Sequence, residues 1–194
     1  PNNSTSLAAA LTYLARGWPV VPAHTPEPDG SCSCRQDDCT SPGKHPRIKW
    51  QAYQNKLPTE YEVRTWWHRW PEANIAIITG AISSLIVVDV DPRHGGDTSV
   101  DLLRPLPETP ICLTGGGGQH IYLQHPKKTV ANGASLLPGI DLRGDGGYVI
   151  APPSLHLSGK RYSWDPSPDY CPITKLPKKI ADLTGNLDLY KAKN

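Results

Sequence analysis

The sequence predicts an α+β fold in which helices come first and a mostly antiparallel sheet follows. Two segments with helical periodicity lie in the first 71 of the 194 residues, and nearly all strand-like segments come after them. The strand-like segments are rich in β-branched and aromatic residues and are separated by glycines. Because helices and strands do not alternate along the chain, this order favours separate helical and sheet regions over an alternating parallel sheet.

The N-terminal part predicts two helices, separated by a strand and a long loop. Leucines and alanines recur at helical spacing within residues 4–17, and a glycine follows where a C-terminal cap belongs. Residues 18–23, WPVVPA, are typical of a short strand. A second helix is predicted within residues 58–71, where Thr59 and Glu62 have the spacing of a capping box.

The rest of the chain predicts strands joined by glycine and proline turns. The strand-like segments are residues 74–80, 84–90, 110–115, 119–125, 146–152 and 160–164. Short helices are expected at residues 98–103 and 178–183. We expect residues 1–194 to form a single domain. Within it, the proline- and cysteine-rich residues 26–46 would be a long inserted loop that needs a stabilising crosslink of its own.

Composition excludes some classes of protein and leaves others open. Twenty basic and eighteen acidic side chains give a net charge of +2, which neither demands nor excludes a nucleic-acid partner. No apolar run approaches the roughly 18 residues of a membrane span and no signal-peptide pattern begins the chain, so we expect a cytoplasmic protein without membrane contact. Three of the five cysteines lie within residues 32–39, which favours a metal site over a secreted disulfide framework.

The stretch LIVVDVDPRHGG, residues 85–96, ends an apolar strand with two carboxylates. Strand side chains alternate, so Asp89 and Asp91 project from one face about 7 Å apart. Cations would offset their repulsion, and two hard divalent ions about 4 Å apart can support phosphoryl transfer. The alternative is local, with Asp91 before Pro92 starting a turn and Asp89 capping a neighbouring group.

Two further motifs carry polar side chains on strand-like segments. In LTGGGGQHIYLQH, glycines such as Gly116 and Gly117 would let a phosphate approach the backbone, and His120 follows them; a flexible hairpin with a structural histidine is the alternative. In GIDLRGDGG, Asp141 and Arg143 alternate outward, and a glycine turn follows. Three acids, a histidine and an arginine on one sheet would suit a two-metal nucleotidyl transfer site, with His120 and Arg143 facing triphosphate oxygens.

These motifs resemble a known family. VVDVD, TGGGGQHIYL and GIDLRGDGGYVIAPPSLHLSGKRYSW, in this order, are similar to the bifunctional DNA primase/polymerase (prim-pol) domain of the archaeo-eukaryotic primase superfamily. ALTYLARGWPVVP and GKHPRIKW resemble its N-terminal part, so the resemblance covers roughly residues 7–165. Many relatives have Ser-x-His where this chain has Gly118, Gln119 and His120, so this chain lacks the serine hydroxyl that could contact a phosphate at this position.

The resemblance implies a fold, an activity and a site. The fold would be the two-lobed primase fold, an α/β lobe packed on an RNA-recognition-motif-like sheet. Asp89, Asp91 and Asp141 would bind two Mg²⁺ or Mn²⁺ ions, and His120 would contact the incoming (d)NTP. The domain would join nucleotides on a single-stranded DNA template, often without a primer, in a bacterial, archaeal or phage-infected cell. Relatives in plasmid or phage replication are fused to a helicase, which here would lie outside this chain because no Walker A motif occurs.

The cysteine-rich loop predicts a structural zinc site. Its ligands would be Cys32, Cys34, Cys39 and His45, with His24 as a possible substitute. A reduced cysteine cluster or a disulfide between the second and third of these cysteines is the alternative. Zinc-bearing insertions also occur in the relatives that the resemblance names.

Basic and aromatic side chains follow the cysteine loop. Lys49, with Lys44 and Arg47, lies beside Trp50 and Tyr53 in a pattern that suits phosphate contacts and base stacking, although such runs are also ordinary solvated faces. Ser154 and His156, after the YVIAPP segment, are further candidates to contact the nucleotide, with an ordinary loop as the alternative. Trp66, Trp67 and Trp70 have helical spacing and are expected in the core.

Two other functions compete with template-directed nucleotidyl transfer. D-x-D after an apolar strand also occurs in phosphatases and glycosyltransferases, although a phosphatase with Asp89 as nucleophile would need a helix-rich alternating fold. The domain could instead be a noncatalytic binder of single-stranded DNA or of a replication origin. The presence of all three acids together with His120 favours the enzyme.

Overall fold

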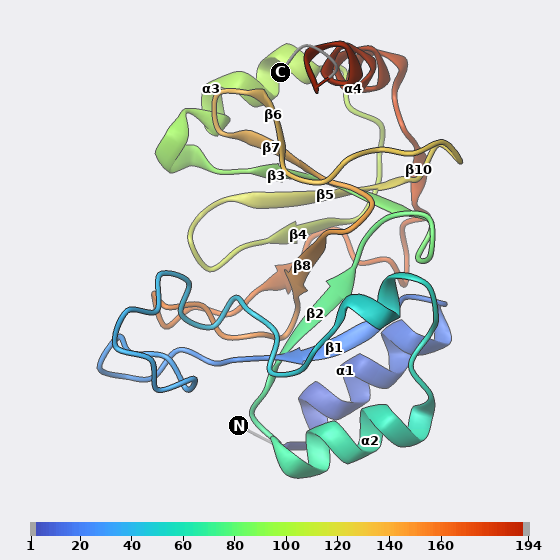
Figure 1. The fold of residues 1–194 in the computed structure, drawn as a ribbon. Coiled ribbons are helices and arrows are strands. Elements are labelled where there is room, and N and C mark those ends of the chain that lie inside the picture. Colours follow the sequence, from blue (N-terminus) through green and yellow to red (C-terminus); the bar gives the residue numbers. More distant parts are fainter. Residues whose placement is uncertain (1–2, 192–194) are drawn as a thin grey trace.

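The computed structural model describes residues 3–191 and shows two sheets packed between outer helices (Figure 1). From one side of the molecule to the other, the layers are two helices, a small sheet, a large sheet and a second group of helices. Nearly all strand pairs are antiparallel. The structure therefore confirms the mixed α+β class with antiparallel sheets.

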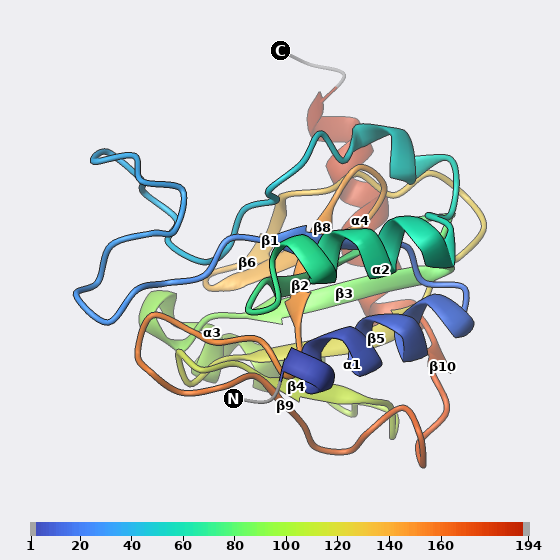
Figure 2. The same cartoon turned by 90° about the horizontal axis from the view of Figure 1, so that it is seen from below.

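The small sheet has the strand order β1-β2-β8. Its strands are β1 (Val20–Ala23), β2 (Asn74–Ile78) and β8 (Tyr148–Ala151). Helices α1 (Asn3–Ala15) and α2 (Glu60–Arg69) lie side by side over its outer face (Figure 2). Every residue of β2 is buried, because one face packs on these helices and the other on the large sheet.

The large sheet has the strand order β6-β7-β3-β5-β4-β9. Its strands are β3 (Leu85–Val90), β4 (Ile111–Leu113), β5 (Gln119–Gln124), β6 (Ala134–Leu137), β7 (Ile140–Arg143) and β9 (Ser163–Trp164). A short strand, β10 (Thr174–Lys175), pairs with β5 in parallel. The remaining helical elements are α3 (Gly96–Ser99), α4 (Lys178–Lys191) and the 3-10 turns η1 (Gln51–Gln54), η2 (Pro92–His94) and η3 (Val100–Leu103).

The two faces of the large sheet pack into different cores. On β3, Leu85 and Val87 face a core that both sheets share with α1 and α2. Ile86 and Val88, which alternate with them, face a second core that includes η3 and α4. Because strand side chains alternate, Asp89 lies on the face of Leu85 and Val87, where the first core ends.

Most elements expected from the sequence are present, with differences at their ends. The capping box of α2 is confirmed, since Thr59 accepts from the Glu62 amide and the Glu62 carboxylate accepts from the Thr59 amide. The helix expected at residues 98–103 is α3 followed by the 3-10 turn η3, and α4 is longer than expected. Strands β6 and β10 were not expected, and within the 160–164 segment only β9 is a strand, although Arg161 also forms an isolated bridge with Leu155. Among the helices of residues 3–191, none has the length and apolar character that a membrane span needs.

Candidate active site and metal centre

Three polar side chains face one another across three neighbouring strands. Asp89 of β3 pairs directly with His120 of β5 on one side and with Asp141 of β7 on the other. Directly paired residues in antiparallel strands have Cβ atoms about 5 Å apart, so this register brings residues 52 positions apart, Asp89 and Asp141, into contact range. The sequence could place each of these side chains on a strand face, and the sheet places them in one row.

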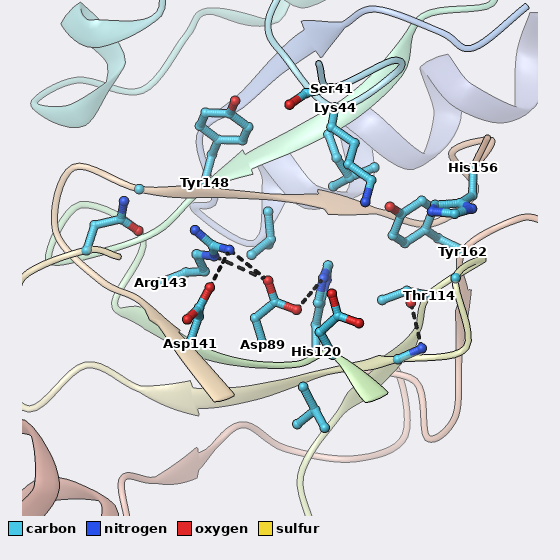
Figure 3. Close-up of a pocket in the computed structure, with 18 of the residues that line it drawn as sticks. Ser41, Lys44, Asp89, Thr114, His120, Asp141, Arg143, Tyr148, His156 and Tyr162 are labelled. Atoms are coloured by element: carbon cyan, nitrogen blue, oxygen red, sulfur yellow. Dashed lines mark hydrogen bonds and ion pairs between the residues drawn. The ribbon is translucent and has the colours of Figure 1, made fainter. Parts of the chain in front are cut away.

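Arg143 bridges the two carboxylates of this row (Figure 3). Its Nη2 donates to Asp89 Oδ2 at 2.9 Å and to Asp141 Oδ2 at 3.2 Å. Like charges opposite each other on a sheet repel, and the guanidinium offsets that repulsion. The arginine therefore supplies, in this structure, the positive charge that two adjacent carboxylates require.

Asp91 follows β3 and has a local role as well as a place at the site. Its carboxylate accepts from the backbone N–H of Arg93 at 3.0 Å and from Arg93 Nη2 at 2.7 Å, so it caps η2. The Arg93 guanidinium holds the pKa of Asp91 well below its usual range. The turn expected as the alternative for Asp91 is thus present, and the same side chain also lines the pocket described next.

A pocket of about 750 Å³ opens above this row, between the large sheet, β8 and the cysteine-rich loop. Of the side chains singled out from the sequence, it includes Asp89, Asp91, His120, Asp141, Arg143, Gly116, His45 and His156. Gly117, Ser154 and Lys49 are not among the residues that line it. Lys44 and Trp50, from the basic and aromatic run, also line it. Arg93, Tyr148 and Tyr162 line it without having been assigned to the site from sequence, and the signal for Arg93 was its position two residues after Asp91.

His120 lies at the floor of the pocket and is almost fully buried. Burial lowers the pKa of its imidazole, which is therefore neutral at neutral pH. Its Nε2 is 3.5 Å from Asp89 Oδ1, and its ring lies 6.0 Å from that of Tyr162. A neutral imidazole held beside a carboxylate can donate a hydrogen bond to an anionic ligand without bringing a charge of its own.

The glycine run before β5 packs closely against neighbouring backbone. A Cβ on Gly115 would lie 2.2 Å from His156 Cβ, and one on Gly118 would lie 2.3 Å from the Val90 carbonyl oxygen. Gly117 has a φ of +87° and open space around it. At Gly115 and Gly118 the missing side chain therefore permits packing of the loop that carries His156 and of the end of β3.

Ser154 is buried within the wall of the site. Its hydroxyl accepts from the Ile75 backbone N–H at 2.8 Å. Beside it, Asn74 is 2% exposed and exchanges two hydrogen bonds with Leu155, donating to its carbonyl at 2.8 Å and accepting from its N–H at 2.8 Å. Ser154 thus fixes the loop that carries His156 to strand β2.

The cysteine-rich loop gathers four donor atoms. Cys32, Cys34, Cys39 and His45 have ligand atoms within 4.8 Å of one another, and His45 Nε2 is 3.5 Å from the sulfurs of Cys32 and Cys39. All three cysteines are free thiols. Burial lowers the pKa of His45, which keeps the imidazole neutral as metal binding requires. Three sulfurs and one imidazole nitrogen fit tetrahedral zinc.

His24 lies next to this cluster without joining it. Its Nδ1 is 3.0 Å from Ser33 Oγ and its ring lies 4.5 Å from that of His45. Among the residues that the structure describes, the four-residue cluster is the only group of three or more such donors within this spacing. His45 is therefore better placed than His24 as the fourth ligand.

A family comparison identifies the chain. The family model described as "Bifunctional DNA primase/polymerase, N-terminal" matches residues 10–179. The chain belongs to this family. No curated protein matches it. Membership of the primase/polymerase family indicates a nucleotidyltransferase of DNA replication, with DNA and nucleotides as substrates and with a requirement for metal ions.

The primase/polymerase chain offers hard oxygen donors for such ions at the pocket. Asp89, Asp91 and Asp141 all line it, and carboxylate oxygens are the ligands that Mg²⁺ and Mn²⁺ prefer. Each of these carboxylates is now bound by an arginine, Arg143 or Arg93. A metal ion bound by these carboxylates would have to compete with the arginines that are paired with them.

Several of the basic and aromatic side chains after the cysteine loop contact other parts of the same domain. Arg47 donates to Ser33 Oγ at 2.7 Å and to the Ala23 carbonyl at 3.2 Å. Tyr53 is buried and donates to Glu62, and the ring of Trp50 packs edge-on against Tyr148 at 5.1 Å. These contacts hold the loop against β1 and the pocket wall.

Proposed function

We propose that this chain is a template-directed DNA primase/polymerase domain that joins (d)NTPs on single-stranded DNA by two-metal nucleotidyl transfer. The observation that carries the proposal is the row of Asp141, Asp89 and His120 in one register across three strands, facing a pocket. Family membership supports the class of reaction, and the row supports where it would take place.

Asp89, Asp91 and Asp141 would hold the divalent ions. Bound there, the ions would lower the pKa of the attacking 3′ hydroxyl and neutralise charge on the departing pyrophosphate. Three carboxylates and three basic side chains, Lys44, Arg93 and Arg143, face the pocket, so their formal charges cancel. Two divalent cations would add an excess of positive charge, which suits a nucleoside triphosphate.

The protein's own side chains would bind and orient the nucleotide. The guanidinium groups of Arg143 and Arg93 can each donate two parallel hydrogen bonds. They could bind phosphate oxygens once metal ions replace them as partners of the carboxylates. His120, neutral and almost fully buried, would donate one hydrogen bond to the nucleotide. Its burial excludes water from the side of the site where it lies.

The same proposal extends to the architecture. The small sheet with α1 and α2 would be the α/β lobe of the primase fold, and the large sheet the second lobe. The described residues would form one catalytic domain with the cysteine loop as an insertion. A helicase domain or protein outside this chain remains a prediction. The phosphatase alternative is not retained, because the sheets are almost entirely antiparallel rather than alternating with helices.

A primer-extension assay tests this function. Purified protein with Mn²⁺ or Mg²⁺, a primed template and labelled dNTPs or NTPs should extend the primer. Asp89→Asn and Asp141→Asn should each lower the rate by about 100-fold or more, because each removes a metal ligand and several kcal/mol of charge stabilisation. Asp101→Asn is the matched control, since Asp101 is exposed and bonded only to Arg104 within the described chain.

The outcomes separate the alternatives. Undiminished extension by Asp89→Asn would refute the assignment of the site. Wild-type protein that binds single-stranded DNA but neither binds dNTP nor extends a primer would instead indicate a noncatalytic DNA-binding domain. An unprimed template in the same assay shows whether the domain also starts chains, and with which class of nucleotide.

A further inference from the structure

We propose that Lys44 binds the phosphates of the incoming nucleotide, and that the metal-binding cluster of Cys32, Cys34, Cys39 and His45 places it there. Metal occupancy of a cluster outside the catalytic row would then control nucleotide affinity. The inference rests on the proposed function, and its experiments are chosen so that the two can fail separately.

Lys44 comes to the pocket from the cysteine loop rather than from either sheet. Figure 3 shows its side chain extending over the row of Asp89 and His120, from the side opposite the sheet floor. The residue is half-buried, and the next residue in the chain is the cluster ligand His45. The position of its backbone is therefore tied directly to the geometry of the cluster.

Lys44 is also the basic side chain of the pocket that is ready to accept a phosphate. Arg143 is engaged by Asp89 and Asp141, and Arg93 by Asp91. Within residues 3–191, the Lys44 ammonium makes no ion pair or hydrogen bond of its own. A triphosphate can therefore pair with Lys44 without first breaking an internal contact, which it must do at either arginine.

The chain on both sides of Lys44 is anchored. The Gly43 carbonyl accepts from Asn74 Nδ2 at 2.9 Å, and the His45 carbonyl accepts from the His24 N–H at 2.8 Å. Asn74 is the buried side chain that also holds Leu155, next to His156. One amide on β2 thus positions the two loops that supply Lys44 and His156 to the pocket, and Asn74 is a positioning residue.

Farther from these anchors, the loop depends on the cluster. Figures 1 and 2 show the blue segment between β1 and η1 reaching outward beyond both sheets. It contains isolated bridges, such as that between Pro26 and Cys32, but no regular strand or helix between Ala23 and Gln51. A metal ion that joins Cys32, Cys34 and Cys39 to His45 would close this loop and remove most of its conformational freedom next to Lys44.

The first experiment measures triphosphate binding directly. An α,β-methylene dNTP, which cannot react, is titrated onto protein with primed template and Mg²⁺, and KM and kcat are measured with natural dNTPs. Lys44→Ala should raise Kd and KM by about 10- to 100-fold, the effect of losing a charge-assisted hydrogen bond, with a smaller change in kcat. Lys44→Arg should restore most of the affinity. Lys128→Ala, an exposed lysine outside the pocket, is the matched control.

These results separate the two proposals. If wild-type protein extends primers and Lys44→Ala binds the analogue as tightly as wild type, Lys44 has no phosphate contact and the inference is overturned. If wild-type protein neither binds the analogue nor extends primers, the proposed function itself is wrong.

The second experiment tests control by the cluster. Reversible removal of the metal should weaken binding of the analogue. Addition of Co²⁺ should then produce thiolate-to-cobalt absorption and restore binding of the analogue. Cys39→Ser should weaken metal and analogue binding together, whereas Cys39→Ser combined with Lys44→Ala should bind the analogue no worse than Lys44→Ala alone.

Circular dichroism verifies that each variant is folded, and the Co²⁺ cycle gives a test on unmutated protein if Cys39→Ser is not. Protein that binds no Zn²⁺ or Co²⁺ at the cluster would overturn control by the cluster. So would unchanged analogue affinity after metal removal, or an equal loss from Cys39→Ser with and without Lys44.

Discussion

Replacing Arg143 by glutamine should make the stability of the protein depend on Mn²⁺. Arg143 bonds to both Asp89 and Asp141, which face each other directly across β3 and β7. Glutamine keeps much of the side-chain volume and removes the charge. Two adjacent carboxylates would then repel each other until another cation binds between them.

The size of the effect follows from Coulomb's law. Two unit charges roughly 5 Å apart at an effective dielectric constant of about 20 repel by about 3 kcal/mol. Screening reduces this to about 1–2 kcal/mol, because the side chains of Asp89 and Asp141 are 24% and 44% exposed. For a domain of this length, that loss corresponds to a melting temperature lower by roughly 2–8 °C.

Thermal unfolding with and without Mn²⁺ measures this. The buffer should be freed of divalent ions on a chelating resin, with no soluble chelator added, so that the cysteine cluster is left intact. Mn²⁺ should recover the loss in Arg143→Gln and should bind this variant more tightly than wild type, where it competes with the guanidinium. Arg64→Gln is the control, because Arg64 forms an exposed ion pair with Glu60 on α2, worth about 0.3–0.5 kcal/mol.

Two results would contradict this reasoning. An unchanged melting temperature in Arg143→Gln without Mn²⁺ would mean that the guanidinium does not offset carboxylate repulsion. An equal deficit with and without Mn²⁺ would mean that Asp89 and Asp141 do not hold a divalent ion. In neither case does the answer depend on measuring catalysis.

Two further predictions concern the frame of the site. Burial opposes ionisation of Asp145, but the N–H groups of Val130 and Ala81 outweigh it and hold its pKa below the usual 3.8. Its stabilisation is thus present above pH 3.8 and lost as pH falls through the lowered pKa. Asp145→Asn should cost about 1–3 kcal/mol near neutral pH and flatten the acid side of the stability profile, as measured by urea unfolding; a parallel profile would contradict this. Gly115→Ala should weaken dNTP binding, because the added Cβ would collide with His156. Gly117→Ala should cost about 1 kcal/mol of stability because Gly117 has a positive φ, but its affinity for dNTP should stay nearer to that of the wild type. Equal affinities for the two variants would argue against a role for the His156 loop at the pocket.

Local spacing in the sequence was enough for several features of the site. The period of two placed Asp89 on the face of Val87, and the structure shows that face running from the shared core into the pocket. The capping box fixed the start of α2, and the cysteine spacing indicated the four residues that the fold gathers. In each case the information lies within a few consecutive residues.

Other features depended on which segments the fold brings together. The sequence predicts a glycine turn after Arg143, and Asp145 lies in that turn, but its carboxylate also accepts from the backbone N–H groups of Ala81 and Val130. It grouped Lys44 with Lys49, whereas only Lys44 lines the pocket. Neither result could come from the residues next to them, because the partners lie elsewhere in the chain.

The sequence by itself determined which side chains share a strand face, because that depends only on the alternation of the backbone. The tertiary structure decided which strands stand next to β3 and in what register, and so that Asp141 and His120 flank Asp89. The physical reason is that register is set by the burial of two separate cores on the two faces of the large sheet. A shift of one residue would turn the row of Asp141, Asp89 and His120 away from the pocket.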